Sequence, residues 1–411
     1  MTPRRVLVAT PLPPEVTGGI EEYAFGVIDA LRAAGDEVAV VTTRGDVPPG
    51  RSRAAYGITA LPAKELLGRP VCLDPRSYLR LFSLVRRSDV VHVHMPFPFV
   101  EAVAAAFGKV LGKPVVVTYH MDAVVDQGGT RSARWFHRLA ERLYRALSAV
   151  PAVDLADRVC TNSRVYAEQS PVLRTRLDRV TVIHQGIDPR KFGELSRDRA
   201  AEVRRELLGE RYTKLVCFVG RLVPYKGLSV LLDAIRARGP PGTLFVIGGK
   251  GPEEPKLRRT IAEHGLTNVR LIGFVPDGDL MNLFGASDLV VSPSVSSLES
   301  TPITLLYASA VGTPVLGTEV GGTGESIPND GIAGLVVPAE DPRALGDAMG
   351  RLLASSGARP TPLPPRYWSD VAADYGKVMV ELRSASSSAP MAQLDSRAGP
   401  YLGPAETFGG K

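Results

Sequence analysis

Two basic residues follow a short apolar run in the second half of the chain and form the clearest candidate site for an anion. Arg221 and Lys226 lie in VGRLVPYKG, directly after a segment with the composition of a buried strand. Two fixed cations at a strand end suit a diphosphate, because charge-assisted hydrogen bonds are strong and arginine can bind two oxygens at once. Gly220 lets the backbone approach such a ligand closely. Solvated loop cations remain the alternative interpretation.

A histidine occupies the corresponding place in the first half of the chain. His120 follows the apolar run VVVTY, and ligands of open α/β sheets bind outside the carboxyl ends of the strands. Asp122, two residues on, could orient or polarise its imidazole. A structural histidine with satisfied hydrogen bonds is the alternative. His92 and His94 lie within a strand pattern, so we expect both to be structural.

Glycines and one acidic residue add weaker signals. Gly18 and Gly19 open a helical pattern after the first strand, where backbone N–H groups can bind an anion. For two glycines alone, a plain strand-to-helix turn is the preferred interpretation. Glu299 precedes an apolar helix over 302–311, where a carboxylate also serves as a good capping residue.

These residues belong to two series of strands that alternate with helical patterns, which predicts parallel sheets with helices on both faces. The first series is expected at 4–9, 37–43, 89–94, 113–119 and 178–183, with a helix over 20–34. The second is expected at 214–220, 242–249, 268–274, 288–294, 313–318 and 334–339.

The length of 411 residues exceeds what one core normally serves, so we expect two domains. The first is a Rossmann-like domain over 1–195 and the second a Rossmann-like domain over 196–364. Apolar residues at helical spacing predict a helix over 365–384 that packs on another part of the protein. Residues 385–411 lack periodicity and are expected to form a disordered tail.

Composition excludes several classes of protein. The 49 Lys and Arg against 43 Asp and Glu give a net charge of +6, which by itself identifies no partner. Three widely spaced cysteines rule out a disulfide scaffold and offer no zinc spacing, so a reducing, cytoplasmic location is expected. No run of 18 apolar residues occurs.

Taken in order, the motifs resemble the retaining glycosyltransferases of family 4, which have the GT-B fold of two doubly wound domains facing a cleft. The resemblance runs from about 6 to 382. It rests on GGIEEYAFGVIDAL, VVVTYHMDAV, VIHQGIDPRKF, VGRLVPYKG and SPSVSSLES…VGTPVLGTEVGGTGE. It implies transfer of a hexosyl group from a nucleotide sugar, either GDP-mannose-like or a UDP-hexose or UDP-N-acetylhexosamine, to a hydroxyl group in natural-product or cell-envelope synthesis, without a metal.

The same resemblance implies roles for individual residues. Gly18 and Gly19 would lie by the donor diphosphate, and Arg221 and Lys226 would neutralise it as it leaves. His120 would contact the transferred sugar and Glu299 its hydroxyls. Further donor contacts are expected in the basic motif and in the helix after Glu299, at Gly220, Thr301, Pro302, Ile303 and Tyr307. Acceptor contacts are expected near His120 and after it, at Tyr119, Asp122, Arg131 and Arg134.

One position departs from the family pattern. A second Glu normally follows the first by eight positions and holds the nucleotide ribose, but Tyr307 stands there. A phenol can form a hydrogen bond but cannot clamp two hydroxyls with a charge. We therefore expect that Tyr307→Glu tightens ribose binding, and a pseudoenzyme that only binds nucleotide sugars remains an alternative.

Other classes of function can be compared with this one. A dinucleotide oxidoreductase would need Gly-x-Gly-x-x-Gly after the first strand, and that spacing is missing. The basic charge alone suggests nucleic acid, but no aromatic-basic platform supports it. An arginine stripe beside an apolar stripe over 131–147 fits an anionic membrane or a phosphorylated lipid acceptor. A helix whose apolar face packs on its own domain is the preferred interpretation. The stripes are Arg131, Arg134, Arg138, Arg142 and Arg145, and Trp135, Leu139, Leu143 and Leu147.

Overall fold

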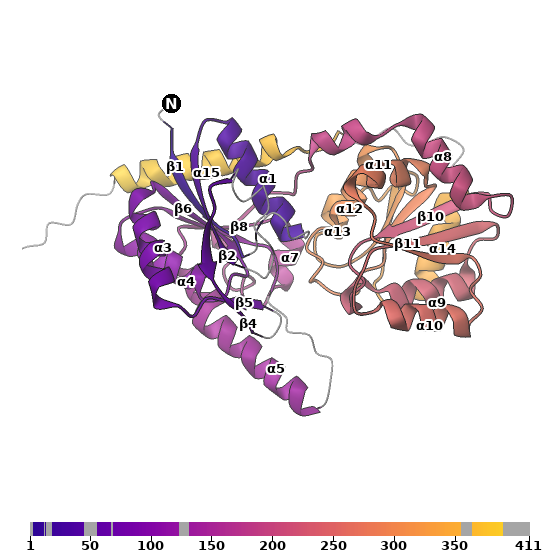
Figure 1. Ribbon diagram of the computed structural model, residues 1–411, viewed down its shortest axis with the longest axis horizontal. Coiled ribbons are helices and arrows are strands. Elements are labelled where there is room, and N and C mark those ends of the chain that lie inside the picture. The colour runs from indigo at the N-terminus through magenta and orange to yellow at the C-terminus, as the bar shows by residue number, and fades with distance from the viewer. Residues whose placement is uncertain are drawn as a thin grey trace, which may run out of the picture.

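The computed structural model describes residues 3–11, 13, 19–44, 56–66, 69–122, 131–354 and 364–388. These residues form two parallel β-sheets covered by helices, which lie next to each other in Figure 1. The predicted α/β class with two doubly wound sheets is therefore confirmed. In the described part of the chain, every helix is too short or too polar to cross a lipid bilayer.

The N-terminal sheet has seven strands in the order β3-β2-β1-β6-β7-β8-β9. The strands are β1 (Arg5–Ala9), β2 (Glu37–Arg44), β3 (Thr59–Pro62), β6 (Val90–Met95), β7 (Val115–Tyr119), β8 (Arg158–Thr161) and β9 (Val180–Val182). Its helices are α1 (Gly19–Ala33), α3 (Pro75–Arg87), α4 (Val100–Val110), α5 (Arg131–Tyr144), α6 (Val150–Leu155) and α7 (Arg164–Gln169). A small antiparallel hairpin joins β4 (Lys64–Leu66) to β5 (Arg69–Val71).

The C-terminal sheet has six strands in the order β12-β11-β10-β13-β14-β15. The strands are β10 (Lys214–Val219), β11 (Thr243–Gly248), β12 (Val269–Gly273), β13 (Leu289–Ser292), β14 (Val315–Thr318) and β15 (Gly334–Val337). Its helices are α8 (Arg197–Leu208), α9 (Leu228–Arg238), α10 (Glu254–Glu263), α11 (Asp277–Ala286), α12 (Ile303–Ala310), α13 (Thr323–Ser326) and α14 (Pro342–Ala354).

Most central strands are buried on both faces, which explains why they are largely apolar. In β1, Leu7 packs against the layer of α3, α4 and α6, whereas Val6 and Val8 pack against α1. Successive side chains of a strand point to opposite faces, so a sheet with helices on both sides needs apolar residues at every position. The eleven predicted strands are all present for this reason.

The structure also contains β3, β8 and the β4–β5 hairpin, none of which was predicted from the sequence. Each is short, and β3 ends at a proline, which cannot donate to a ladder and normally argues against a strand. β8 lies between β7 and β9 and is completed by pairing with both. Whether such short segments form strands depends on pairing with their neighbours in the sheet, because a few residues carry too little local pattern.

The terminal helix α15 (Trp368–Ser388) lies across the N-terminal sheet beside α1 (Figure 1). Gly26 of α1 makes room for the Trp368 indole, because a Cβ at residue 26 would stand 2.4 Å from its Cδ2. The chain thus returns to its first domain at the end. The helix continues four residues past the predicted end at 384, and the remaining residues of the predicted tail lie outside the described part.

The two segments that connect the sheets run next to each other. The Ile187 N–H donates to the Arg366 carbonyl at 2.9 Å, and Ile187 forms a bridge with Tyr367. Gly186 is required at this crossing, since a Cβ there would lie 2.9 Å from the Tyr367 backbone. Both connections therefore pass through one point, beside the face where the two domains meet.

Candidate active site

The basic motif and the Glu299 segment come from neighbouring strands. β10 and β13 pair in parallel, and the segments 220–227 and 293–302 follow them at the same edge of the sheet. From β10 the sheet continues through β11 to β12, whereas from β13 it continues the other way through β14 to β15. Such a point, where the strand order reverses, is where open α/β sheets bind ligands.

A buried ion pair joins these two segments. Lys226 Nζ donates to Glu299 Oε2, and the two side chains are only 14% and 8% exposed. Ser294 Oγ donates to the same carboxylate oxygen at 3.0 Å. Burial alone would lower the pKa of Lys226, but the Glu299 carboxylate outweighs it, so the pKa is raised and the amine stays charged. A cation and an acceptor are therefore fixed together at the strand ends.

Two glycines allow the backbone to close around this pair. Gly227 has φ 67°, and a Cβ there would lie 1.9 Å from the Pro293 carbonyl oxygen. Gly321 has φ 50°, and its Cβ would lie 1.9 Å from the Glu299 carbonyl oxygen. A side chain at either position would push apart the segments that carry Lys226 and Glu299.

Arg221 supplies a second cation. Its side chain is exposed, and it makes no ion pair with any residue that the structure describes. Gly220 donates its N–H to the Gly248 carbonyl at 3.0 Å, which holds the loop on the sheet. Both cations therefore follow β10, with Lys226 in a buried ion pair and Arg221 exposed.

The other expected donor residues lie at the start of α12 and α1. Thr301 is buried and donates through Oγ1 to the Ser300 carbonyl at 2.8 Å, Pro302 caps α12 and Ile303 begins it. Gly19 is the first residue of α1, with open space where its Cβ would be. Gly18 lies outside the described residues.

His120 follows β7 as expected, but it belongs to a buried chain of polar groups. It is 5% exposed, and its Nε2 lies 2.9 Å from His94 Nδ1. The ring of Tyr23 packs edge-on against it at 4.8 Å between centroids. The structure thus adds His94 to the site. The sequence held one signal for this contact. His92 and His94 alternate along β6, which pairs with β7, the strand that leads to His120.

The same chain of contacts reaches the terminal helix. His92 Nε2 lies 2.7 Å from Thr118 Oγ1, which lies 2.7 Å from the hydroxyl of Tyr375 in α15. The Tyr375 hydroxyl lies 3.1 Å from that of Tyr23. His92 also packs on the Tyr375 ring at 4.7 Å between centroids. The terminal helix therefore supports the histidines from behind the sheet.

Burial keeps these histidines neutral. It lowers the pKa of His92 and of His120 to about 3, and it lowers the pKa of His94 well below the usual value. A neutral imidazole at position 120 can donate or accept one hydrogen bond, but it brings no charge to a ligand.

Tyr307, which was expected among the donor contacts, lies at the boundary between the two domains. Its side chain is 1% exposed, and its hydroxyl donates to Glu22 Oε1 of α1 at 2.7 Å. The same hydroxyl accepts from the Asp188 N–H at 3.0 Å, and Lys191 Nζ lies 3.3 Å from Glu22 Oε1. Tyr307 therefore joins the two domains. A Glu at this position would face Glu22, and its effect on ribose binding stays a prediction.

A second contact between the domains lies at α7. Glu325 of α13 accepts from the Arg164 and Val165 N–H groups at 3.0 and 2.6 Å, and so caps the start of α7. Asn162 Nδ2 donates to Ser300 Oγ, next to Glu299, at 3.2 Å. The glycine-rich segment after β14 thus holds Glu299 on one side and the N-terminal domain on the other.

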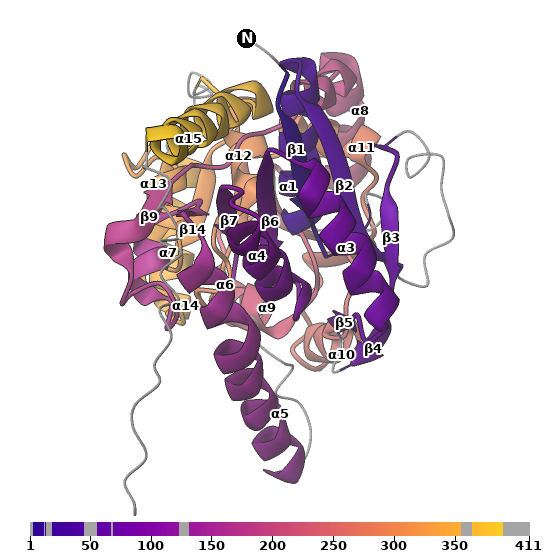
Figure 2. The same cartoon turned by 90° about the vertical axis from the view of Figure 1, so that its left-hand side faces the viewer.

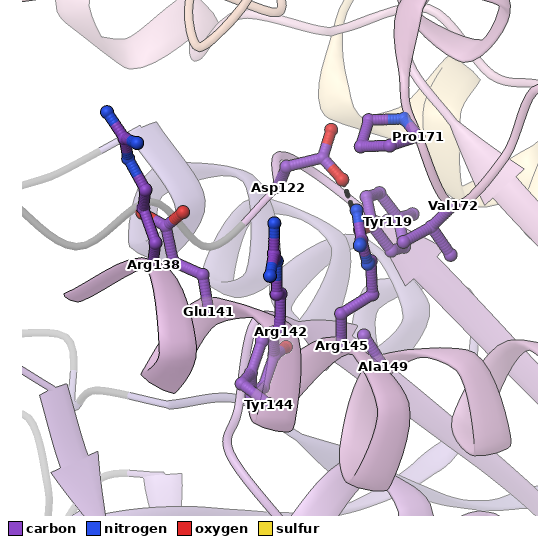
Figure 3. Close-up of a pocket in the computed structure, with 10 residues that line it drawn as sticks. All are labelled: Tyr119, Asp122, Arg138, Glu141, Arg142, Tyr144, Arg145, Ala149, Pro171 and Val172. Atoms are coloured by element: carbon purple, nitrogen blue, oxygen red, sulfur yellow. Dashed lines mark hydrogen bonds between the residues drawn. The ribbon is translucent and has the colours of Figure 1, made fainter. Parts of the chain in front are cut away.

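Asp122 has partners other than the predicted one. Its carboxylate accepts from the hydroxyls of Tyr119 at 2.7 Å, Tyr166 at 2.9 Å and Ser170 at 3.1 Å. The imidazole of His120 is hydrogen-bonded to His94 instead, so the expectation that Asp122 orients it is wrong. Asp122 instead lines a cavity of about 320 Å³ beside α5 (Figure 3).

The helix α5 also differs from the preferred interpretation. It projects from the N-terminal domain in both views (Figures 1 and 2), and its apolar residues are exposed, with Trp135 at 66% and Leu147, just after its end, at 59%. The apolar face therefore does not pack on the domain. Arg138, Arg142 and Arg145 line the cavity, whereas the side chains of Arg131 and Arg134 lie outside the described part.

Comparisons with known proteins agree over both halves. A model described as Glycosyl transferases group 1 matches residues 201–362, and one described as Glycosyltransferase Family 4 matches 17–191. The chain is 32% identical over 336 residues to the D-rhamnosyltransferase WbpZ of Pseudomonas aeruginosa, with 82% of each chain covered. It is 36% identical over 365 residues to a D-inositol 3-phosphate glycosyltransferase of Corynebacterium glutamicum, with 84% of this chain and 85% of that one covered.

The fold matches solved structures as well. The Anabaena protein HepE in complex with UDP-glucose superposes with a TM-score of 0.64 at 20% identity, over 93% of this chain and 98% of that one. A likeness at this identity shows a shared fold, which is the expected GT-B arrangement.

The contact at Tyr307 gives a test of its role. Tyr307→Phe should cost about 1–2 kcal/mol of folding free energy, because both hydrogen bonds of the buried hydroxyl are lost. Tyr307→Glu should cost more, about 2–4 kcal/mol, because it buries a second carboxylate beside Glu22. Urea unfolding measures both losses. Adding Glu22→Gln should recover part of the Tyr307→Glu loss, and a Tyr307→Glu protein as stable as the parent would contradict this assignment.

The buried histidines predict acid sensitivity. In the unfolded chain they titrate near 6.5, whereas His92 and His120 titrate near 3 when folded, so unfolding takes up protons below pH 6.5. Stability should therefore fall as the pH drops, by about 2 kcal/mol per histidine between pH 6.5 and 5. Urea midpoints followed by fluorescence measure this. His92→Gln should flatten the pH dependence, the exposed His264→Gln should not, and the reverse result would refute the assignment.

Proposed function

The chain belongs to the group 1, family 4 glycosyltransferases, which transfer sugars from nucleotide-sugar donors, and on that premise we propose that it is a retaining hexosyltransferase with a hydroxyl acceptor. The donor is GDP-mannose-like or a UDP-hexose or UDP-N-acetylhexosamine. The acceptor belongs to natural-product or cell-envelope glycan and glycolipid synthesis. WbpZ, by name a D-rhamnosyltransferase, and the UDP-glucose complex of HepE support a hexosyl donor.

The cluster of Arg221, Lys226 and Glu299 carries this proposal. As the sugar–phosphate bond breaks, negative charge grows on the leaving diphosphate. Lys226 is already fixed and charged beside that position, and Arg221 is exposed and unpaired among the described residues. Cations that are fixed before the reaction stabilise the developing charge without reorganisation, which is differential binding of the transition state. No bound metal is required for this step.

Glu299 and His120 hold the sugar in this scheme. The Glu299 carboxylate accepts from Lys226 and Ser294, which fixes its orientation and leaves lone pairs for sugar hydroxyls. His120 is neutral and its Nε2 is bonded to His94, so it contributes a hydrogen bond of fixed direction. Neither residue takes up or releases a proton in this scheme.

A peripheral membrane enzyme is the second candidate, with a phosphorylated lipid as acceptor. The observation that favours it is the projecting helix α5, whose apolar residues are exposed beside arginines. A basic amphipathic helix of this kind lies in the interface of an anionic membrane. A pseudoenzyme that binds nucleotide sugars without transfer is the remaining alternative. Turnover of the donor would exclude it.

Donor turnover tests the proposed function. We expect one member of a panel of GDP-, UDP- and dTDP-sugars to raise the melting temperature and to be hydrolysed slowly or transferred in the presence of EDTA. Thermal shift and chromatography of the released nucleotide measure this. Binding without release would favour the pseudoenzyme, and the absence of binding to any nucleotide would disprove the proposal.

Substitution of the cations tests the site assignment. Arg221→Ala should leave stability unchanged, because the side chain is exposed. It should raise the activation barrier by about 2–3 kcal/mol, which lowers kcat roughly 30- to 150-fold. Lys226→Ala should have a similar kinetic effect and should also destabilise the protein, since it leaves Glu299 buried and unpaired. The double substitution should cost less than the sum, because both cations meet one diphosphate.

A matched variant separates the two effects of Lys226. Lys226→Ala with Glu299→Gln should regain stability without regaining activity. Arg236→Ala, an exposed arginine of α9 on the same domain, serves as the control and should leave kcat unchanged. Unchanged transfer by Arg221→Ala would show that this cation is only solvated.

The exposed face of α5 gives a further test. Leu143→Ser with Leu147→Ser should weaken binding to anionic vesicles by about 2–4 kcal/mol, roughly 30-fold or more, because two leucines no longer enter the interface. Phe274→Ser with Ile332→Ser removes equally exposed apolar groups from the other domain and should change little. Vesicle flotation measures both, and Trp135 fluorescence reports insertion. Equal binding by the two variants would argue against a role for α5.

A further inference from the structure

Asn162 lies at the carboxyl end of the N-terminal sheet, level with His120. Thr118 of β7 pairs with Cys160 of β8, and each of the two residues stands two positions further along its own strand. Successive side chains alternate between the faces of a sheet, so this equal spacing puts His120 and Asn162 on the same face. His120 packs on Tyr23 of α1, which identifies that face as the one that α1 covers. The two residues are therefore neighbours on adjacent strands.

The side chain of Asn162 is buried but only half satisfied. It is 4% exposed, and its Nδ2 donates to Ser300 Oγ of the other domain at 3.2 Å. Its Oδ1 is buried and has no hydrogen-bond partner among the described residues. Turning the amide over would exchange the two atoms and still leave one of them unpaired. A buried polar atom without a partner costs free energy, so stability alone does not account for an asparagine at this position.

The backbone of Asn162 is fixed by its own domain. Its carbonyl accepts from His184 Nδ1 at 3.1 Å. The Thr161 carbonyl before it accepts from the Ile183 N–H at 2.8 Å, and Ser163 after it caps the start of α7. Asn162 is thus a fixed point of the N-terminal domain, and its amide reaches from there to the other domain.

Ser300 belongs to the segment that carries Glu299, and this segment is held from two sides. On its own domain, the Ser300 carbonyl accepts from the Gly322 N–H at 2.8 Å. Only a glycine fits at 322, because a Cβ there would lie 2.4 Å from the Ser300 carbonyl oxygen and 2.5 Å from Ser163 Cβ. Asn162 holds the segment from the other domain. Since Ser300 follows Glu299 directly, the place of its backbone affects where the Glu299 carboxylate lies.

We propose that Asn162 is a positioning residue for sugar transfer. Through Ser300, it holds Glu299 in register with His120. This inference deepens the proposed function and rests on it, because Glu299 and His120 are the residues proposed to hold the sugar. They come from different domains, so their relative position depends on contacts between the domains. Asn162 lies beside His120 in one domain and bonds to the residue after Glu299 in the other, so a single side chain relates the two. A misplacement of about 1 Å can lower the rate of an enzymatic reaction about 100-fold.

Asn162→Leu tests this role, because it keeps the branched shape of the side chain but removes the amide. The kcat for turnover of the donor should fall at least about tenfold, since the sugar loses its alignment. The melting temperature should stay the same or rise, because the unpaired oxygen is removed together with the bond to Ser300. Calorimetry with UDP and GDP should show that binding of the nucleotide changes less than about twofold, which is the pattern of a residue that acts on the chemical step.

Asn268→Leu is the matched control. Asn268 is half-buried, and its Nδ2 donates to the Thr243 carbonyl at 3.2 Å within the C-terminal domain. This substitution should lower the melting temperature and leave kcat unchanged, which is the opposite pattern. An Asn162→Leu protein that loses stability but keeps its kcat would show that Asn162 only joins the domains, and it would overturn the proposal.

Ser300→Ala tests whether the effect passes through Ser300. It should lower kcat by a factor similar to that of Asn162→Leu. The double substitution should lower kcat no further than either single one, because both remove the same hydrogen bond. Effects that multiply in the double variant would refute the proposed route.

Hydrogen exchange measures the contact without any turnover. Asn162→Leu should speed amide exchange in the segment 296–302 and leave that of α9 unchanged, because only the first has lost a support. Unchanged exchange in 296–302 would count against a positioning role. Failure of the proposed function is a different result, since it would appear as a lack of nucleotide binding by the unchanged protein.

Discussion

The site depends on one buried ion pair, between Lys226 and Glu299. Neither charge could stay at a strand end, largely hidden from water, without the other. The pair requires two loops to come within hydrogen-bonding distance, and that requires parallel pairing of β10 and β13. The glycines at 227 and 321 remove the side chains that would hold the loops apart. Sheet order, backbone conformation and charge thus support one arrangement.

The N-terminal domain contributes neutral side chains rather than a charged pair. Its histidines are neutral because they are buried, and they are oriented through hydroxyl groups rather than carboxylates. Tyr375 completes this chain from the last helix, so the end of the sequence supports a site near its beginning. The return of α15 therefore has two physical roles, since it covers an apolar face of the sheet and orients polar groups behind His120.

The contacts between the domains lie close to the proposed chemistry. Tyr307 meets Glu22, Glu325 caps α7, and Ser300 accepts from Asn162. Each contact joins a residue of the C-terminal domain to an element of the N-terminal domain. A ligand that changes the position of the Glu299 segment would also change how the domains meet.

The sequence by itself determined the two parallel sheets, the order of the motifs and the cations at the end of β10, because these depend on local periodicity and on which residues follow a strand. It did not determine β3 or β8, whose short patterns are completed by neighbours. Nor did it indicate that the hydroxyl of Tyr307 donates to Glu22, 285 residues away in the chain.

Only the tertiary structure decided which faces are covered. The amphipathic pattern of α5 is the same whether its apolar side packs on the domain or faces outward, and here it faces outward. Likewise, the arginine stripe lines a cavity only because Tyr119, Asp122 and Val172 close the space opposite it. Periodicity states that a face is apolar or basic. What that face meets depends on contacts between residues far apart in the chain.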